Sequence, residues 1–181
     1  DLSDYQSAIT NYKKADEILA SKYPATDGER VRLYALLGGV EHSLNHYDES
    51  EHYYKLYANA IKEIYGEHSL NYINAQIYLA NAQGFAGHIK DGCGNYTSAV
   101  TSLKEVIKKR LPYMNTAERE GFWSPLSSLL TYMTPYALKA ELYQTEYTQT
   151  CYDALLLSKA FLLDSERSVY DIIQRDGDKT D

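Results

Sequence analysis

The stretch YQSAITNYKKA, residues 5–15, carries a spacing that recurs along the chain and decides the fold. Its tyrosines and alanines stand at offsets of 0, 3, 7 and 10, and these offsets trace one face of an α-helix. The same offsets occur in three stripes, which are Tyr5, Ala8, Tyr12 and Ala15, then Tyr47, Ser50, Tyr54 and Tyr57, then Tyr96, Ala99, Leu103 and Val106. Self-similarity at a fixed spacing of this size indicates a stacked array of helices.

The distances between the stripes predict the length of the repeating unit. The first two stripes lie 42 residues apart, and the last two lie 49 residues apart. We therefore expect a 42-residue unit with an insertion of seven residues in the third unit. The glycine-rich segment DGCGN, residues 91–95, is the predicted site of that insertion, because glycine suits a wide turn between helices.

A second helix-like segment precedes each of the last two stripes. These segments are ERVRLYALLGGVEHSLNHY at 29–47 and SLNYINAQIYLANAQGFAGHIK at 69–90. Each unit is therefore predicted to be a helical hairpin. Four residue pairs have the capping-box spacing of a helix start, namely Ser3 with Gln6, Thr26 with Glu29, Asp48 with Glu51 and Asn115 with Glu118. The predicted fold is all-α, a superhelix of stacked antiparallel helical hairpins with extra C-terminal helices.

The order of large and small residues in these hairpins resembles the tetratricopeptide repeat. The residues that carry the resemblance are Tyr34, Leu37, Gly38, Tyr47, Ser50 and Tyr54 in one unit, and Leu79, Ala80, Tyr96 and Ala99 in the next. Glu41 and Tyr57 depart from the pattern, in which an aromatic residue and an alanine are usual. The 42-residue period is similar to that of the kinesin-light-chain type. In this alignment Asp1 to Tyr5 correspond to the turn inside a repeat, so we expect the natural polypeptide to begin further upstream.

After the repeats, predicted at residues 1–112, we expect a helical extension at 113–181 that packs on them. Ten of the thirteen residues from Cys151 to Leu163 are apolar, so nearly the whole circumference of this helix is expected to be covered by protein. With the preceding GFWSPL, this segment resembles the junction between tetratricopeptide repeats and a CHAT domain, which has a caspase-like peptidase fold. The resemblance implies that the parent protein continues past Asp181 into that domain. The predicted docking surface consists of Tyr152, Leu155, Leu156, Phe161 and Leu162.

Composition disfavours several classes of partner. The net charge is -7, and the basic residues are scattered, so nucleic acid is not an expected partner. The Cys151 to Leu163 segment is too short and carries Asp153 and Lys159, so we predict no membrane insertion. Two cysteines provide no disulfide framework. The compartment stays open, with the cytoplasm favoured.

No catalytic residue, metal ligand or cofactor is predicted. His88 and Cys93 are five residues apart, but we expect Cys93 in the glycine-rich loop, with no strand to hold a thiol and an imidazole in register. His42 and His46 have the i, i+4 spacing of two metal ligands but lack a nameable third. GCG at 92–94 lacks the Lys-Ser/Thr of a phosphate loop. We interpret the chain as non-catalytic.

The leading functional hypothesis is a scaffold that binds a peptide or partner domain in a concave groove lined by the first helix of each hairpin. The resemblance to tetratricopeptide repeats places the groove at Arg32, Ala35, Gly39, His42 and Ser43, and in the next unit at Asn74, Ile77, Asn81, Gly84 and Phe85. Two alternatives stay open. One is a regulatory or docking domain for a downstream caspase-like peptidase of the same polypeptide. The other is a carbohydrate-binding helical-repeat protein, suggested by the 19 tyrosines.

Overall fold

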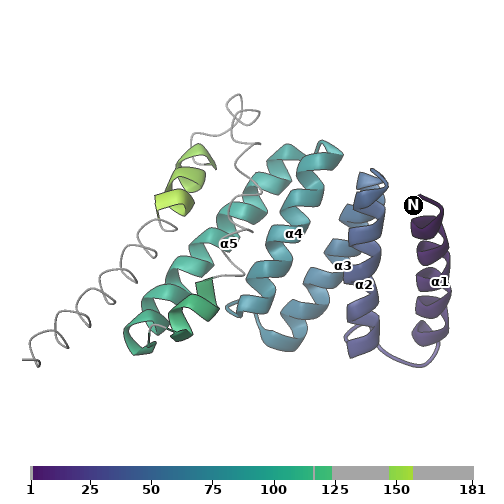
Figure 1. Cartoon of the computed structure of the whole chain (residues 1–181), viewed down its shortest axis with the longest axis horizontal. Coiled ribbons are helices and arrows are strands. Elements are labelled where there is room, and N and C mark those ends of the chain that lie inside the picture. Colours follow the sequence, from purple (N-terminus) through teal and green to yellow (C-terminus); the bar gives the residue numbers. More distant parts are fainter. Residues whose placement is uncertain (1, 116, 124–146, 157–181) are drawn as a thin grey trace, which may run out of the picture. The chain divides into compact units, whose positions relative to one another are not determined.

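The computed structural model describes residues 2–115, 117–123 and 147–156, and all regular secondary structure in these ranges is helical (Figure 1). The named elements are α1 (Leu2–Ala20), α2 (Gly28–Ser43), α3 (Tyr47–Tyr65), α4 (Leu70–Ala86), α5 (Ile89–Arg110) and the short 3-10 helix η1 (Leu111–Tyr113). Helical turns also cover 117–123 and 147–156. The chain divides into two compact units, residues 1–103 and 104–181, which are described separately below.

The first unit is a row of antiparallel helices, as the sequence predicts. Successive helices pack as neighbours, with α1 against α2, α2 against α3, and α3 against α4. The start of α5 lies on α4, where Asn95 Nδ2 donates a hydrogen bond to Gln83 Oε1 at 2.8 Å. The prediction of an all-α fold built from helical hairpins is confirmed.

The two hairpins formed by α2 to α5 repeat with a period of 42 residues, and the predicted insertion of seven residues is wrong. Helix α4 begins 42 residues after α2, and α5 begins 42 residues after α3. The structural counterpart of Tyr54 is therefore Tyr96, while Tyr47 corresponds to Ile89. The stripe pattern misled the alignment because seven residues are close to two helical turns. Moving the alignment by seven residues therefore keeps the stripe on the same face of the helix.

The segment DGCGN, predicted as a wide turn, lies inside α5. A Cβ atom added at Gly92 would stand 2.8 Å from the carbonyl oxygen of Ala80, so glycine is needed where α5 crosses α4. The previous hairpin uses the same crossing point, because Ser50 Oγ donates a buried hydrogen bond of 2.8 Å to the carbonyl oxygen of Gly38. Small residues thus set a close contact between the two helices of each hairpin.

Helix starts agree only in part with the predicted capping boxes. The pair Asn115 and Glu118 is confirmed, since each side chain accepts a 2.9 Å hydrogen bond from the other residue's backbone N–H. The cap of α2 is Asp27, whose Oδ1 accepts from the next helical N–H groups, so the prediction of Thr26 is wrong. Asp48 lies inside α3, which begins at Tyr47 without a side-chain cap, and Ser3 lies inside α1, so neither residue caps a helix start as predicted.

The chain start also differs from expectation. Helix α1 already includes Leu2 to Tyr5, so the turn predicted at Asp1 to Tyr5 is not found in the described part of that segment. The Tyr5 stripe of α1 precedes the Tyr47 stripe of α3 by 42 residues, so α1 is the counterpart of the second helix of a hairpin, although its described bounds precede those of α3 by 45 residues.

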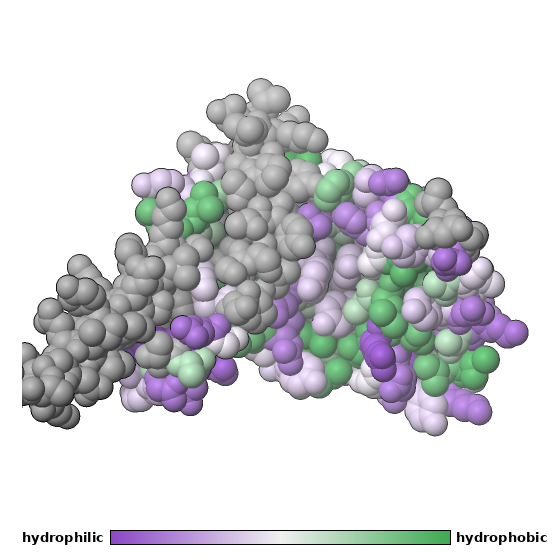
Figure 2. All heavy atoms as spheres, viewed as in Figure 1, coloured by the Kyte–Doolittle hydropathy of each residue, from purple (hydrophilic) through white to green (hydrophobic). Residues whose placement is uncertain are grey.

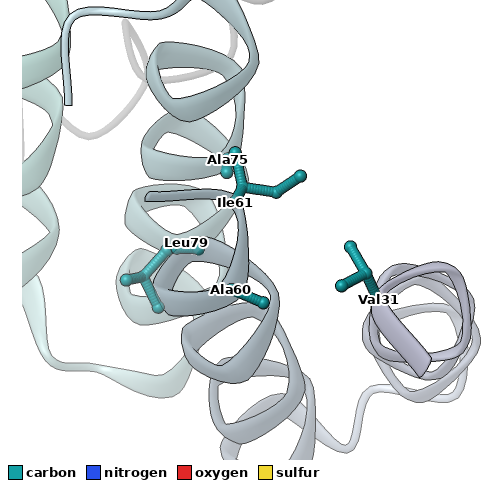
Figure 3. Close-up of a cluster of buried hydrophobic side chains, with 6 residues drawn as sticks. Val31, Ala60, Ile61, Ala75 and Leu79 are labelled. Carbon is teal, nitrogen blue, oxygen red and sulfur yellow. The ribbon is translucent and has the colours of Figure 1, made fainter. Parts of the chain in front are cut away.

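Hydrophobic contacts between the hairpins hold the first unit together. In Figure 3, Val31 of α2 points toward Ala60 and Ile61 of α3, and Ala75 and Leu79 of α4 belong to the same buried cluster. Half-buried tyrosines, namely Tyr54, Tyr57 and Tyr72, pack against this cluster. The tyrosine-rich composition therefore serves helix packing. On the face seen in Figure 2, hydrophobic residues also gather over the region that α1 and α2 occupy in Figure 1.

In the second unit, the described helical segment at 147–156 has one buried and one exposed side. Tyr147, Cys151 and Ala154 are buried, and Asp153 Oδ2 accepts a 2.6 Å hydrogen bond from Lys104 Nζ. The predicted docking residues Tyr152, Leu155 and Leu156 are 57%, 38% and 47% exposed. The other two, Phe161 and Leu162, lie outside the described residues.

The glycine contact in α5 can be tested by substitution. We expect Gly92→Ala to lower the free energy of unfolding by about 1 to 3 kcal/mol, because the new methyl group meets the Ala80 carbonyl. The matched control is Gly94→Ala on the same helix, where nothing lies within 4 Å of the new Cβ. Because alanine favours a helix, this control should raise stability by up to about 1 kcal/mol. Denaturant unfolding measures both, and equal effects would contradict the close crossing.

Candidate functional site

The first helices of two successive hairpins, α2 and α4, present side chains at equivalent positions 42 residues apart. Four of the equivalent pairs that reach the surface are Arg32 with Asn74, Leu36 with Tyr78, Gly39 with Asn81, and Ser43 with Phe85. With the adjoining His42 and the rings of Tyr47 and Tyr54, we call these residues the α2–α4 face. Both helices belong to the first unit, so this face is formed within one compact body.

The groove residues predicted from the sequence are found at three levels of exposure. Arg32, Ser43 and Phe85 are exposed, and a partly exposed group consists of Ala35, Gly39, His42, Asn74 and Asn81. Ile77 and Gly84 are buried, Ile77 to 1% exposure, and lie in the packed interior of the unit. Eight of the ten predicted residues are thus at least partly accessible to a ligand.

Two accessible residues were missed by the sequence analysis. Leu36 and Tyr78 are 37% and 38% exposed, whereas Ile77, beside Tyr78 in the chain, is buried. One step along a helix rotates the side chain by about 100°, so an error of one residue exchanges an accessible position for a buried one. The apolar, β-branched side chain of Ile77 was the available signal that position 78, not 77, faces outward.

Aromatic rings cluster at one end of the α2–α4 face. Phe85 stacks on Tyr47 with ring centroids 5.0 Å apart, and the His42 ring meets Phe85 edge-on at 4.7 Å. Burial lowers the pKa of His42, so its imidazole is neutral at pH 7. The buried His42 Nε2 has no hydrogen-bond partner within the described ranges. This end therefore combines an exposed apolar ring with an unused polar atom.

A pair of tyrosines lies in the middle of the face. Tyr54 and Tyr78 stack with centroids 5.5 Å apart and planes 11° from parallel. The Tyr54 ring lies over Gly38, where an added Cβ would be 3.0 Å from three ring atoms. Burial raises the pKa of Tyr54 to about 12, so its hydroxyl keeps its proton at neutral pH.

The other end of the face carries Arg32 and Asn74. In the part of the chain that the structure describes, the exposed Arg32 guanidinium makes no ion pair, and the buried Oδ1 of Asn74 accepts no hydrogen bond. No residue of the face is acidic, although the chain carries a net charge of -7. The exposed Glu29 lies one turn before Arg32 on α2, so an acidic group borders this end of the face.

Polar side chains away from this face join neighbouring hairpins, and the sequence analysis did not anticipate them. Glu41, the departure from the family pattern, is 2% exposed and pairs with Lys13 of α1 at 3.0 Å and with His46 at 2.8 Å. Its counterpart Gln83 donates a 3.1 Å hydrogen bond to Glu51. These contacts also explain why Glu51 does not act as a capping residue.

The residues considered for chemistry are engaged in packing or pairing. Cys93 is 2% exposed within α5, so the prediction that it lies in a loop is wrong. His88, five residues before it, pairs with Glu51 at 2.6 Å, and His46 pairs with Glu41. Among the described residues, no three side chains of the types that bind metals gather into a possible site.

The Glu51–His88 contact gives a pH dependence that can be measured. The hydrogen bond to Glu51 raises the pKa of His88 above 6.5, so NMR titration should place its midpoint above that value. Its contribution to stability is present below about pH 6.5 and is lost as the pH rises through the folded-state pKa. Glu51→Gln should move the midpoint back toward 6.5, and an unchanged midpoint would contradict the pairing.

His42 serves as the internal comparison because its pKa is shifted the other way. Its midpoint should lie below 6.5, since burial disfavours the charged ring. Stability linked to His42 is therefore present above about pH 6.5 and is lost as the pH falls through the folded-state pKa. The same titration reads both histidines, and a His42 midpoint above 6.5 would contradict its burial on this face.

Comparison of the chain with protein-family models, curated proteins and solved structures gives no match. No helix within the described ranges combines the length and apolar character needed to cross a bilayer.

Proposed function

We propose that this chain is a tetratricopeptide-like scaffold that binds a peptide segment of a partner protein on the α2–α4 face. The observation that carries the proposal is the repetition of accessible side chains at equivalent positions of α2 and α4, with exposed Tyr78 and Phe85 among them. Repeats stacked side by side offer a continuous surface of this kind for extended ligands. The proposed role is that of a binding domain without catalysis of its own.

The chemistry of the face supports a protein ligand. Aromatic rings and arginine are the side chains that contribute most at protein interfaces, and the face has both in Tyr78, Phe85 and Arg32. The partly exposed Asn81 adds a side-chain amide, which suits the amide groups of a peptide. The net charge of -7 disfavours nucleic acid as the ligand.

The proposal is tested by substitution on the face. After a partner is captured with the intact protein and purified, we expect Tyr78→Ala, Arg32→Ala and Asn81→Ala each to weaken its binding. The loss expected for Tyr78→Ala is about 2 kcal/mol, near 30-fold in Kd by calorimetry, since buried aromatic anchors dominate such interfaces. Thermal unfolding of each variant separates lost contacts from lost fold.

The matched control is Tyr65→Ala. Tyr65 is a tyrosine with 54% exposure at the end of α3 and is not a member of the α2–α4 face. Its removal should leave the Kd unchanged. If the face variants bind as well as the control does, the partner does not use this face.

A second candidate function rests on the exposed apolar side of the segment at 147–156. Tyr152, Leu155 and Leu156 are exposed together there, which suits docking of a further domain of the same polypeptide, such as the caspase-like domain that the resemblance implies. In a longer polypeptide that includes such a domain, backbone hydrogen exchange at 147–156 should become slower. Unchanged exchange would contradict this role.

A further inference from the structure

Tyr54 belongs to α3, the second helix of its hairpin. Its hydroxyl nevertheless reaches the α2–α4 face, through a gap left by Gly38 and Gly39. The ring crosses α2 at Gly38, where an added Cβ would lie 3.0 Å from the ring. The hydroxyl ends 3.5 Å from the Cβ position of Gly39, which is partly exposed between Leu36 and Ser43. A Cβ at Gly39 would be in van der Waals contact with this hydroxyl, so glycine leaves this side of the hydroxyl open.

The hydroxyl is a proton donor that the described structure does not use. Within that part of the chain, Tyr54 contacts Tyr78 by stacking, and its hydroxyl makes no hydrogen bond. The neighbouring Tyr47, in contrast, donates its hydroxyl proton to Asn45 Oδ1 at 2.6 Å. Burial of the Tyr54 ring keeps the phenol protonated, so it offers a neutral donor and not an anion.

Other polar groups continue the line along α4. Asn81 is the counterpart of Gly39, and the partly exposed Asn74 stands two turns earlier, or about 10 Å along the helix. Phe85 follows Asn81 by about 6 Å. An extended chain advances about 3.3 Å per residue, so this row matches roughly five residues of extended peptide.

We infer that the Tyr54 hydroxyl donates a hydrogen bond to a main-chain carbonyl of an extended peptide lying along α2 and α4. This inference rests on the proposed function and names the group of the peptide that the face recognises, a main-chain carbonyl. The occupant is a peptide because the Tyr54 donor and the side-chain amides of Asn74 and Asn81 are spaced for successive main-chain groups of an extended chain. Specificity for side chains comes from the ring cluster at Phe85.

The test uses a defined probe, a synthetic peptide selected from a random heptapeptide library on the immobilised full chain. Its Kd is measured by fluorescence anisotropy for the original chain and for two variants. Tyr54→Phe keeps the ring and removes the donor, and Kd should rise roughly 2- to 10-fold, the effect of one neutral hydrogen bond. Tyr65→Phe, which removes an exposed hydroxyl outside the face, should leave Kd unchanged.

Gly39→Ala separates access from stability. Its methyl group would stand at ordinary contact distance, 3.5 Å, from the hydroxyl, and alanine favours a helix, so the melting temperature should not fall. Because the methyl covers the donor, Kd should nevertheless rise at least as much as in Tyr54→Phe. A Gly39→Ala chain that binds with unchanged Kd would overturn the inference.

Replacing peptide amides one at a time by esters locates the acceptor. An ester carbonyl is a weaker acceptor, so one replacement should weaken binding to the original chain but not to Tyr54→Phe. If Tyr78→Ala abolishes binding while Tyr54→Phe binds as the original chain does, the proposed function stands and the hydroxyl inference fails. If neither variant changes Kd, or if the library yields no binding peptide, both are overturned.

Discussion

The close crossing of two helices within each hairpin is the contact on which the rest of the first unit depends. In one hairpin the Ser50 hydroxyl bonds the Gly38 carbonyl, and in the next the backbone of Gly92 lies against the Ala80 carbonyl. A small residue on each side lets the helix axes approach. Once the crossing is fixed, the second helix of a hairpin can reach across the first, and Tyr54 does so over Gly38. The α2–α4 face thus includes a group from α3.

The rings on this face have two roles at once. Tyr78 and Phe85 stack on Tyr54 and Tyr47, which positions them, and they still expose 38% and 43% of their surface. A ring held in place by its neighbours loses little conformational freedom when a ligand covers its open side. The face is therefore pre-organised by the packing that joins the hairpins. This links the tyrosine content of the chain to the proposed binding surface.

The sequence predicts the helical hairpins well because apolar residues at helical offsets mark the side of a helix that is buried, whichever helix it packs against. It misplaces the third unit, since a shift of seven residues keeps the same side of a helix and only the partner helix distinguishes the two registers. The sequence analysis places Gly92 in a turn because sequence alone does not distinguish a glycine needed for close helix packing from a glycine needed in a loop. Eight of the ten residues predicted to line a groove are at least partly accessible, and one step along α4 separates buried Ile77 from exposed Tyr78.

The polar contacts between hairpins make each junction chemically distinct. Between α1 and α2 the buried carboxylate belongs to Glu41 and its cation to Lys13, whereas at the next junction the carboxylate of Glu51 faces Gln83 and His88. A hairpin moved to another place in the row would bury an acid without its base, at a cost of several kcal/mol. Repeats of similar shape are therefore not interchangeable, and the chain specifies the order of its own units by charge.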